Sequence, residues 1–289
     1  MRIVHIYERQ RPVFSFEFFP PRTERGVRTL MRTVSELREL SPDFVSVTYV
    51  QDLARRPLTV ELVSRIKREL DLEAMAHLTC VNASREQVHG VLATLEQNGI
   101  DNVLALRGDI PDAESIVAPR ESWFQSSTEL ASYIREHFGF CIGGAAHPET
   151  HPESPDEETD LAYARAKVEA GCEFLITQFF FTNADYFRFV ERARAAGIDV
   201  PIVPGIMPVT SYKGIVRMTS LNGQSIPAAL LEQLDPVQED SVAVAEIGVA
   251  WAKRQCLELV QQGVPGIHFY TLNRSPATRQ ILSYLREQL

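Results

Sequence analysis

Short apolar segments recur through this chain of 289 residues, and they number eight. Each segment is almost continuously hydrophobic rather than alternating, which is typical of strands buried on both faces of a parallel sheet covered by helices. We expect strands at Val13–Phe19, Phe44–Val50, Ala74–Cys80, Val103–Asp109, Cys141–His147, Phe174–Phe181, Pro201–Met207 and Ile267–Leu272. The chain is therefore predicted to be an α/β protein built from eight strand–helix units.

The segments between these strands have the apolar spacing of helices, and several are followed by a glycine that commonly ends a helix. We expect helices at Arg28–Leu40, Leu58–Leu70, Arg85–Asn98, Glu129–Phe138, Asn183–Ala196, Ser241–Gln262 and Pro276–Leu289. A further helix, the fifth along the chain, is expected to run to Gly171. Ser154 is its predicted N-cap, because Pro155 suits the first helical position and Glu157 suits the third.

No change of composition divides the chain, and its length suits a (β/α)8 barrel, which takes about 250 residues. We therefore predict a single-domain TIM barrel over residues 1–289, with an extra short helix and loop within Ser211–Asp240. A doubly wound open sheet is the structural alternative, but it requires a glycine-rich turn after the first strand. Here that strand ends in Phe18-Phe19-Pro20-Pro21.

The composition is that of an ordinary globular protein, with 45% hydrophobic and 23% charged residues. The formal net charge of -9 and the lack of a basic stripe argue against a nucleic-acid partner. No apolar run approaches the roughly 18 residues that a membrane span requires, and the first residues lack the apolar core of a signal peptide. The four cysteines are far apart and form no CxxC pair, so we expect reduced thiols in a cytoplasmic protein.

One carboxylate stands inside an aromatic strand, in the segment Phe14-Ser15-Phe16-Glu17-Phe18. Strand alternation places Glu17 on the same face as Ser15 and opposite the phenylalanines. Burial raises the pKa of a carboxyl group, which is how a protein keeps a proton donor near neutral pH. Glu17 is therefore the first candidate for a general acid. The alternative is a glutamate that faces solvent at a strand end or pairs with an arginine such as Arg22.

Barrel active sites lie at the carboxyl ends of the strands, and seven of the eight predicted strands deliver a polar group there. The seventh strand is the exception. These groups include Glu17, Thr48, His77, Thr79, Asp109, His147, Thr177, Gln178, His268, Tyr270 and Thr271. The set mixes acids, bases and amides with aromatic side chains, which suits a planar, hydrogen-bonding ligand better than a metal.

A catalytic metal is not predicted. His147 and His151 have the spacing of a helical zinc pair, but Pro148 and Pro152 prevent a helix there. The first strand has no His-x-His pair, and neither a Ser nor a Cys occupies a nucleophile elbow. We therefore expect neither metal-dependent hydrolysis nor acyl transfer.

Eight short motifs stand at these strand ends. In chain order they are Ser15-Phe-Glu-Phe-Phe-Pro-Pro21, Val45-Ser-Val-Thr-Tyr49, Ala76-His-Leu-Thr79, Ala105-Leu-Arg-Gly-Asp109, Pro148-Glu-x-His-Pro-Glu153, Ile176-Thr-Gln-Phe-Phe-Phe181, Pro204-Gly-Ile-Met-Pro208 and His268-Phe-Tyr-Thr-Leu-Asn-Arg274. Together they resemble the motifs of bacterial methylenetetrahydrofolate reductase, and the resemblance covers essentially the whole chain. The catalytic domain of that family is a (β/α)8 barrel that holds FAD.

The resemblance implies reduction of 5,10-methylenetetrahydrofolate to 5-methyltetrahydrofolate by NADH or NADPH through bound FAD, in a ping-pong scheme. A ferredoxin-linked donor also stays open. Opening of the methylene bridge to an iminium requires a proton donor, which in the family is the Glu of the FEFFPP motif, here Glu17. The resemblance further implies a homo-oligomer. No long segment follows the last predicted helix, so we expect no regulatory domain of the kind carried by eukaryotic members.

The resemblance also implies roles for other residues. Asp109 of the LRGD motif is the second implied catalytic residue, and it would bind and orient the pterin. The implied substrate contacts are Gln178, Met218 and Arg274, and Arg274 would pair with the glutamate carboxylate of the folate. The implied FAD contacts are Thr48, His77, Arg107, Gly108, Asp109, Ala145, His147, His151, Asp160 and Lys167.

Several departures from the family pattern fall at the implied flavin site. The segment Val50–Pro57 replaces a glycine-rich stretch, His147 replaces a Tyr, and Met218 replaces a Phe that stacks on nicotinamide or pterin. Two alternatives therefore stay open. One is a flavin-independent reductase of the same substrate, and the other is a pterin- or folate-binding barrel of methyltransferase type.

Overall fold

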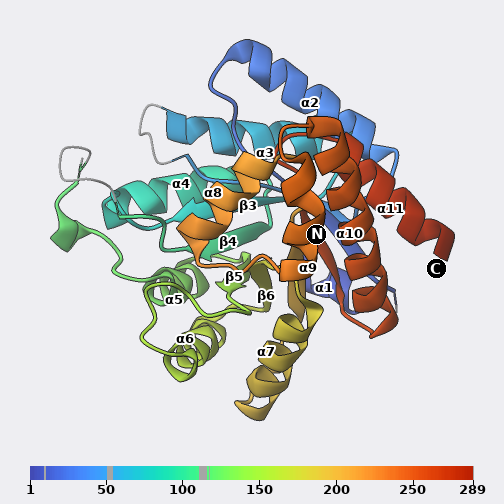
Figure 1. The fold of residues 1–289 in the computed structure, drawn as a ribbon. Coiled ribbons are helices and arrows are strands. Elements are labelled where there is room, and N and C mark those ends of the chain that lie inside the picture. The colour runs from blue at the N-terminus through green and yellow to red at the C-terminus, as the bar shows by residue number, and fades with distance from the viewer. Residues whose placement is uncertain (10, 51–54, 111–115, 117, 289) are drawn as a thin grey trace.

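Eight strands run parallel and pair in chain order, and the eighth strand closes the sheet onto the first (Figure 1). The computed structural model describes residues 1–9, 11–50, 55–110, 116 and 118–288. The strands are β1 (Val13–Phe18), β2 (Phe44–Val47), β3 (Ala74–Thr79), β4 (Asn102–Leu106), β5 (Cys141–Ala146), β6 (Phe174–Phe179), β7 (Ile202–Ile206) and β8 (Gly266–Tyr270). The predicted (β/α)8 TIM barrel is confirmed.

All eight strands end earlier than predicted at the carboxyl end of the barrel. β2 ends at Val47 rather than Val50, and β4 ends at Leu106 rather than Asp109. The backbone beyond the strands adopts conformations that a sheet does not allow, with a φ of 84° at Gly108 and 50° at Leu272. The polar residues that follow the strands therefore lie on loops.

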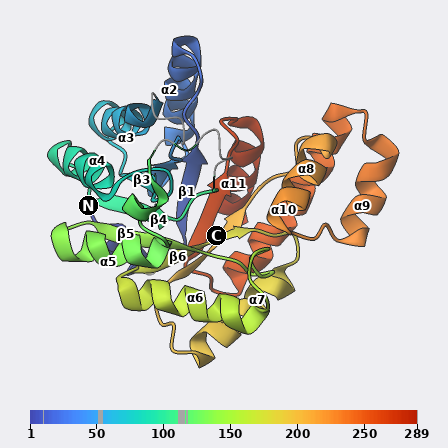
Figure 2. The ribbon, with the colours of Figure 1, turned by 90° about the vertical axis from the view of Figure 1, so that its left-hand side faces the viewer.

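Helices cover the outer face of the barrel (Figure 2). They are α2 (Glu24–Arg38), α3 (Arg56–Leu70), α4 (Arg85–Gln97), α5 (Ser127–His137), α6 (Glu157–Ala170), α7 (Asn183–Ala195), α10 (Ser241–Gln261) and α11 (Pro276–Gln288). Side-chain caps begin many of them. Ser84 and Gln87 form a reciprocal capping box at α4, for example. The eight predicted connecting helices are thus present.

The predicted cap of α6 is wrong. The helix begins at Glu157 after Asp156, and the Asp156 carboxylate accepts a hydrogen bond of 2.7 Å from the Thr159 amide. Ser154 instead donates its hydroxyl to Asp160 Oδ1 at 3.1 Å. Ser and Asp cap helices about equally well, and here the Ser154 hydroxyl is engaged by Asp160 while Asp156 takes the cap position.

Two parts of the chain hold more helix than predicted. The short helix α1 (Val4–Tyr7) precedes β1 and was not expected. The segment after β7 holds two helices, α8 (Tyr212–Asn222) and α9 (Ala228–Leu234), followed by a 3-10 turn at Asp235–Val237. Figure 2 shows α8 and α9 standing off the barrel beside α10.

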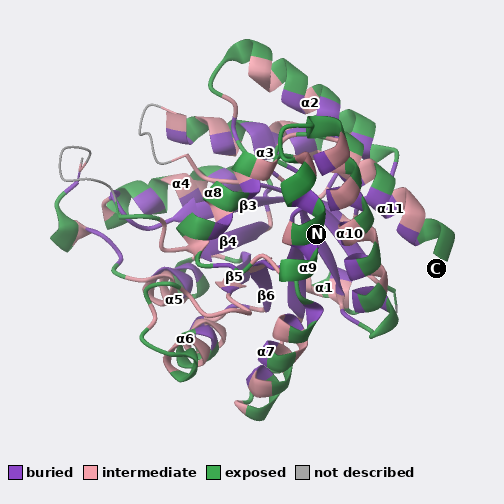
Figure 3. Ribbon diagram, viewed as in Figure 1, coloured by how far each residue is buried: buried purple, intermediate pink, exposed green. Residues whose placement is uncertain are grey.

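Strand side chains alternate between an outer and an inner core, and both are buried (Figure 3). Phe14, Phe16 and Phe18 of β1 belong to the outer core between the barrel and its helices. Val13 belongs instead to an inner cluster that takes side chains from each of the first seven strands and from α1. Ser15 and Glu17 share the direction of Val13, so they point into the barrel.

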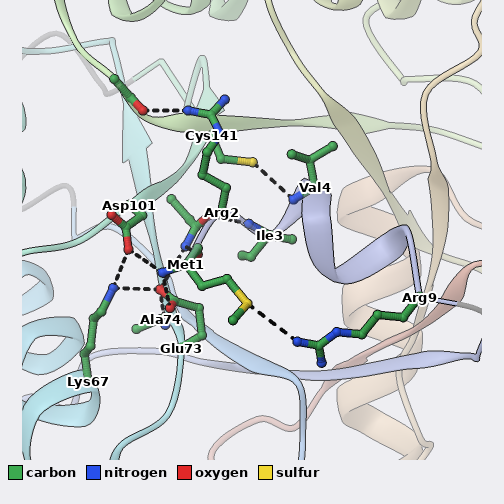
Figure 4. Close-up of polar contacts among 12 residues, drawn as sticks. Met1, Arg2, Ile3, Val4, Arg9, Lys67, Glu73, Ala74, Asp101 and Cys141 are labelled. Atoms are coloured by element: carbon green, nitrogen blue, oxygen red, sulfur yellow. Dashed lines mark hydrogen bonds and ion pairs between the residues drawn. The ribbon is translucent and has the colours of Figure 1, made fainter.

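Polar contacts hold the chain start against the amino ends of the strands (Figure 4). The Met1 ammonium lies 2.7 Å from Glu73 Oε2 and 2.5 Å from Asp101 Oδ2. The Ile3 amide donates to Asn102 Oδ1 at 2.7 Å. α1 and the residues before it therefore cover the amino end of the barrel.

Candidate active site

A hollow of about 290 Å³, called here the mouth site, opens at the carboxyl ends of the strands. Six of the residues implied by the resemblance line it: Glu17, His77, Ala145, His147, Gln178 and Met218. The rest of its wall includes Phe19, Leu104, Leu106, Ile176, Phe179, Met207, Asn222, Tyr270 and Leu272. The volume is near the lower end of the range of about 300–1,000 Å³ for small-molecule sites.

Glu17 lies between two imidazoles in the mouth site. Its Oε2 atom is 3.5 Å from His77 Nε2 and 3.5 Å from His268 Nε2, and its side chain is 18% exposed. The His77 contact lacks hydrogen-bonding direction, and His77 Nε2 has no hydrogen-bond partner. Glu17 therefore neither faces open solvent nor pairs with Arg22 among the described ion pairs. It is a partly buried carboxyl group that faces a ligand-sized hollow.

His268 is connected to β1 on its other side. Its Nδ1 atom lies 2.7 Å from Ser15 Oγ, and both residues are fully buried. If Ser15 donates this hydrogen bond, then His268 Nε2 carries the imidazole proton and faces Glu17. The residues Ser15, His268 and Glu17 thus form a continuous polar path inside the barrel.

His77 is uncharged at neutral pH. Burial lowers the pKa of its imidazole to about 4, with nearby His268 also lowering it and Glu17 opposing the shift. The unfolded chain binds this proton near pH 6.5, whereas the folded chain does not until about pH 4. Protonation therefore favours the unfolded state, and stability is lost as pH falls from about 6.5 to about 4.

We expect the variant His77→Gln to lose this part of the pH dependence. The free energy of unfolding should fall less steeply in the variant, by up to roughly 1.4 kcal/mol per pH unit between pH 6 and 4.5. Urea unfolding at a series of pH values measures the slope. His89→Gln, at an exposed histidine on α4, is the matched control. Equal slopes in wild type and His77→Gln would contradict a buried neutral His77.

A second layer of polar residues lies behind His147. Burial lowers the pKa of His147 to about 3, with smaller contributions from Lys167 and His151, so this imidazole is also neutral. Lys167 donates to Ala145 O at 2.7 Å, and the His147 and His151 rings meet edge to face at 4.6 Å. Asp160 accepts the His151 amide at 3.1 Å. The structure thus brings together five of the implied FAD contacts from β5, from α6 and from the loop between them.

The implied contacts that follow β2 and β4 do not line the mouth site. Arg107 is held by Glu153 in a bidentate ion pair of 2.6 and 2.8 Å. Gly108 follows with its positive φ, and Asp109 is exposed. Thr48 is held through its backbone, with its amide donating to Phe18 O at 2.8 Å. Of the altered segment Val50–Pro57, residues 51–54 lie outside the described residues.

The implied substrate contacts are divided between two hollows. Gln178 lies in the mouth site, where its amide nitrogen is 3.3 Å from Asn222 Oδ1, and Met218 faces the site from α8. Arg274 is exposed and lines a neighbouring hollow of about 440 Å³. Tyr270 and Leu272 line both hollows, so the two are adjacent.

The resemblance assigned no role to Ser15, His268, Asn222 or Tyr270, although His268 and Tyr270 were among the polar groups expected at the strand ends. Ser15 shares the strand face of Glu17, and a closed barrel places the first and last strands side by side. That pairing aligns Ser15 with His268 and Glu17 with Tyr270. The shared strand face of Ser15 and Glu17 and the pairing of the first strand with the last could both have been inferred from the sequence. Asn222 lies on α8, a helix whose position no strand pattern predicts.

Cysteines and metal ligands do not extend this site. Cys80, Cys141, Cys172 and Cys256 are free and buried, as predicted, and burial raises the pKa of Cys80 to about 12. Among the described residues, no group of three or more His, Cys, Asp or Glu side chains has the geometry to hold a metal ion.

Within the same residues, none of the helices has the length and apolar character to cross a bilayer.

The fold and the mouth site define a class: a (β/α)8-barrel protein with a polar site at the carboxyl ends of its strands, where barrel enzymes have theirs. The family model described as Methylenetetrahydrofolate reductase matches residues 2–286. The chain belongs to the methylenetetrahydrofolate reductase family, as its motifs predicted.

Two relatives and one solved structure illustrate the match. The chain is 37% identical over 295 residues to Methylenetetrahydrofolate reductase (NADH) 1 of Arabidopsis thaliana, covering 98% of this chain and 50% of that protein. It is 38% identical over 261 residues to the 5,10-methylenetetrahydrofolate reductase of Escherichia coli (strain K12), covering 90% of this chain and 86% of that protein. The chain thus spans about half the length of the plant relatives.

The solved structure shares the fold at low sequence identity. It is an uncharacterized protein from Clostridium thermocellum that binds two copies of 5-methyl-5,6,7,8-tetrahydrofolic acid. The TM-score is 0.66 at 16% identity, over 100% of this chain and 99% of that one. This similarity supports the barrel architecture.

Proposed function

We propose that this protein reduces 5,10-methylenetetrahydrofolate to 5-methyltetrahydrofolate. The proposed electron donor is NADH or NADPH, and the proposed cofactor is FAD. The observation that carries the proposal is the position of Glu17, which faces the mouth site together with five other residues implied by the family motifs. Family membership and the reductase names of the relatives support it. The folate bound by the Clostridium thermocellum barrel supports a folate ligand in this fold.

Glu17 is the proposed general acid. Proton transfer to N10 of the substrate breaks the bond between N10 and the methylene carbon, which leaves an iminium at N5. Addition of hydride to that carbon then gives the methyl group. The carboxyl group reaches the mouth site from inside the barrel, where His268, itself hydrogen-bonded to Ser15, holds its position.

The residues present fit a flavin ring in part. His77 Nε2 and Thr79 Oγ1 are buried without hydrogen-bond partners, and both belong to inward-facing positions at the end of β3. A planar ring with polar edges would give these two atoms hydrogen-bond partners. FAD, when bound, supplies the hydride. Lys167 and Arg107 are the cations available to its phosphates, and Arg107 would have to share or leave Glu153.

The remaining site residues are proposed to hold the folate. Gln178 presents an amide to the pterin from β6, and Met218 packs against the ring from α8. Asp109 is proposed to orient the pterin from the β4 loop. A homo-oligomer stays a prediction.

The visible spectrum and one assay test the proposal. The purified protein should carry bound flavin that absorbs blue light, and NADH should bleach it without oxygen. Added methylenetetrahydrofolate should restore the colour with formation of 5-methyltetrahydrofolate. A colourless protein that ignores FAD yet oxidises NADH with this substrate would indicate the flavin-independent alternative. Absence of folate reduction with NADH, with NADPH and with reduced ferredoxin would reject the reductase activity and leave a folate-binding barrel.

Arg274→Ala is expected to raise the KM for the folate about tenfold with little change in kcat, because a contact made equally in ground and transition states affects binding alone. Steady-state kinetics over folate concentration measures both constants. Arg279→Ala is the control, because Arg279 lies on α11 and pairs with Glu39 at 3.2 Å. An unchanged KM in Arg274→Ala would remove Arg274 from the site.

A further inference from the structure

A second hollow lies outside the barrel and is larger than the mouth site. It is a groove of about 690 Å³ between α3 and α4, and it shares no lining residue with the mouth site. Val60 of α3 and Val88 and Val91 of α4 supply apolar walls. Tyr49 and Arg56 stand at the end nearest the strand termini. The proposed reductase chemistry makes no use of this groove.

Small side chains give the groove its depth. Ser64, Ala83 and Gly90 line it. A Cβ atom added at Gly90 would meet nothing within 4 Å, so the position opens onto free space. Glycine inside a helix costs roughly 0.5–1 kcal/mol relative to alanine, and no close contact requires it at this position.

Arg56 provides the groove with a buried cation. The residue is 6% exposed, and its guanidinium lies 5.8 Å from the centre of the Tyr49 ring. Nη2 donates to Asn82 O at 2.7 Å, but Nε is buried with no hydrogen-bond partner. No carboxylate among the described residues forms an ion pair with it. A buried charge without a counter-charge is costly, and an anion that binds beside it recovers part of that cost.

Three arginines line the groove, and they differ in burial: Arg56 is buried, whereas Arg68 is exposed to solvent. Arg65 is already paired, at 3.6 Å with Glu61 and at 2.9 Å with Glu69. Three arginines and one glutamate line the groove, in a chain whose formal net charge is -9. The groove is therefore a locally cationic, apolar-walled site on an acidic protein.

We propose that the groove between α3 and α4 binds an amphipathic carboxylate, with the carboxylate at Arg56 and the apolar body along Val60, Val88 and Val91. A guanidinium presents donors in a planar fork that matches a carboxylate. The volume lies within the range of about 300–1,000 Å³ that holds small organic ligands. This assignment is independent of the reductase proposal, and its test does not use catalytic activity.

Decanoate and decanol are suitable probes, since they share an apolar chain and differ in charge. Titrations followed by amide chemical shifts should place decanoate at α3 and α4. Decanoate should bind at least about tenfold more tightly than decanol, because a hydrogen bond to a charged group contributes that much. Equal affinity of the two probes, or no decanoate binding, would overturn the proposal.

Two variants test the two ends of the groove. Arg56→Met keeps the apolar stem and should reduce decanoate affinity to that of decanol. Gly90→Phe should fill the groove and abolish binding of both probes, whereas the matched variant Gly90→Ala should bind decanoate like wild type. Thermal unfolding checks that each variant is folded. Unchanged decanoate affinity in either Arg56→Met or Gly90→Phe would overturn the site, and the Gly90 pair gives this answer with Arg56 intact.

Discussion

Replacement of Glu17 by Gln is expected to abolish folate reduction while NADH still reduces the bound flavin. Glutamine has almost the shape of glutamate and keeps the position near His77 and His268, but it has no acidic proton to donate. Loss of a general acid commonly costs about 10²–10⁴ in rate. In the proposed ping-pong scheme only the step that opens the methylene bridge needs the acid, so folate reduction should slow while flavin reduction keeps its rate. Anaerobic stopped-flow absorbance measures each half separately.

Glu173→Gln is the matched control for this experiment. Glu173 is also a partly exposed glutamate, at 29%, but it lies at the amino end of the barrel, where it pairs with Arg2 at 2.7 Å. The same chemical change there should leave both half-reactions near wild-type rates. Equal loss of both half-reactions in Glu17→Gln would reject the general-acid role, because a structural defect affects flavin and folate alike.

Gly248→Ala is expected to lower the free energy of unfolding by about 3 kcal/mol. Gly248 is buried in α10, and a Cβ atom there would overlap the carbonyl group of Val209 in the segment after β7. Backbone cannot move aside as a side-chain end does, so α10 or that segment must shift. The same segment follows Met207, which lines the mouth site, so activity should fall as well. Urea unfolding measures the stability change.

Gly90→Ala provides the contrast, since it is the same substitution in another helix. Gly90 is exposed on α4 with open space around its Cβ position. Here alanine should raise the free energy of unfolding by about 0.5–1 kcal/mol, because it reduces the backbone freedom of the unfolded chain. Opposite signs at the two positions are therefore expected. A stability change of the same sign and size at both would contradict the close approach of α10 to Val209.

The fold was largely predictable from the sequence because strand and helix patterns are local. Eight apolar runs separated by helical periodicity gave the barrel, and the polar groups at the strand ends gave the position of the mouth site. The first and last residues of the helices and strands were less predictable. The predicted cap at Ser154 was wrong because Asp156 competes for the same role and Asp160 holds the Ser154 hydroxyl. The short helix α1 was missed because four residues carry too little periodicity to identify a helix.

The site was predictable in its members but not in its pairings. Six of the implied residues meet in the mouth site. Arg107 is instead paired with Glu153, which lies 46 residues away along the chain, and Arg274 lies in a neighbouring hollow. A strand pattern gives the direction of a side chain, but it does not give the partner that neutralises it.

The chain by itself determined the barrel, the face on which Glu17 lies and the family to which the protein belongs. These follow from apolar spacing and from motifs that need no long-range information. Tertiary structure alone decided that Glu17 meets two imidazoles and that Ser15 hydrogen-bonds to His268, 253 residues away. It also decided that Arg56 is buried in the groove between α3 and α4, with no carboxylate paired to it among the residues that the structure describes. The physical reason is that barrel closure and helix packing set these distances, and both depend on contacts between residues far apart in sequence.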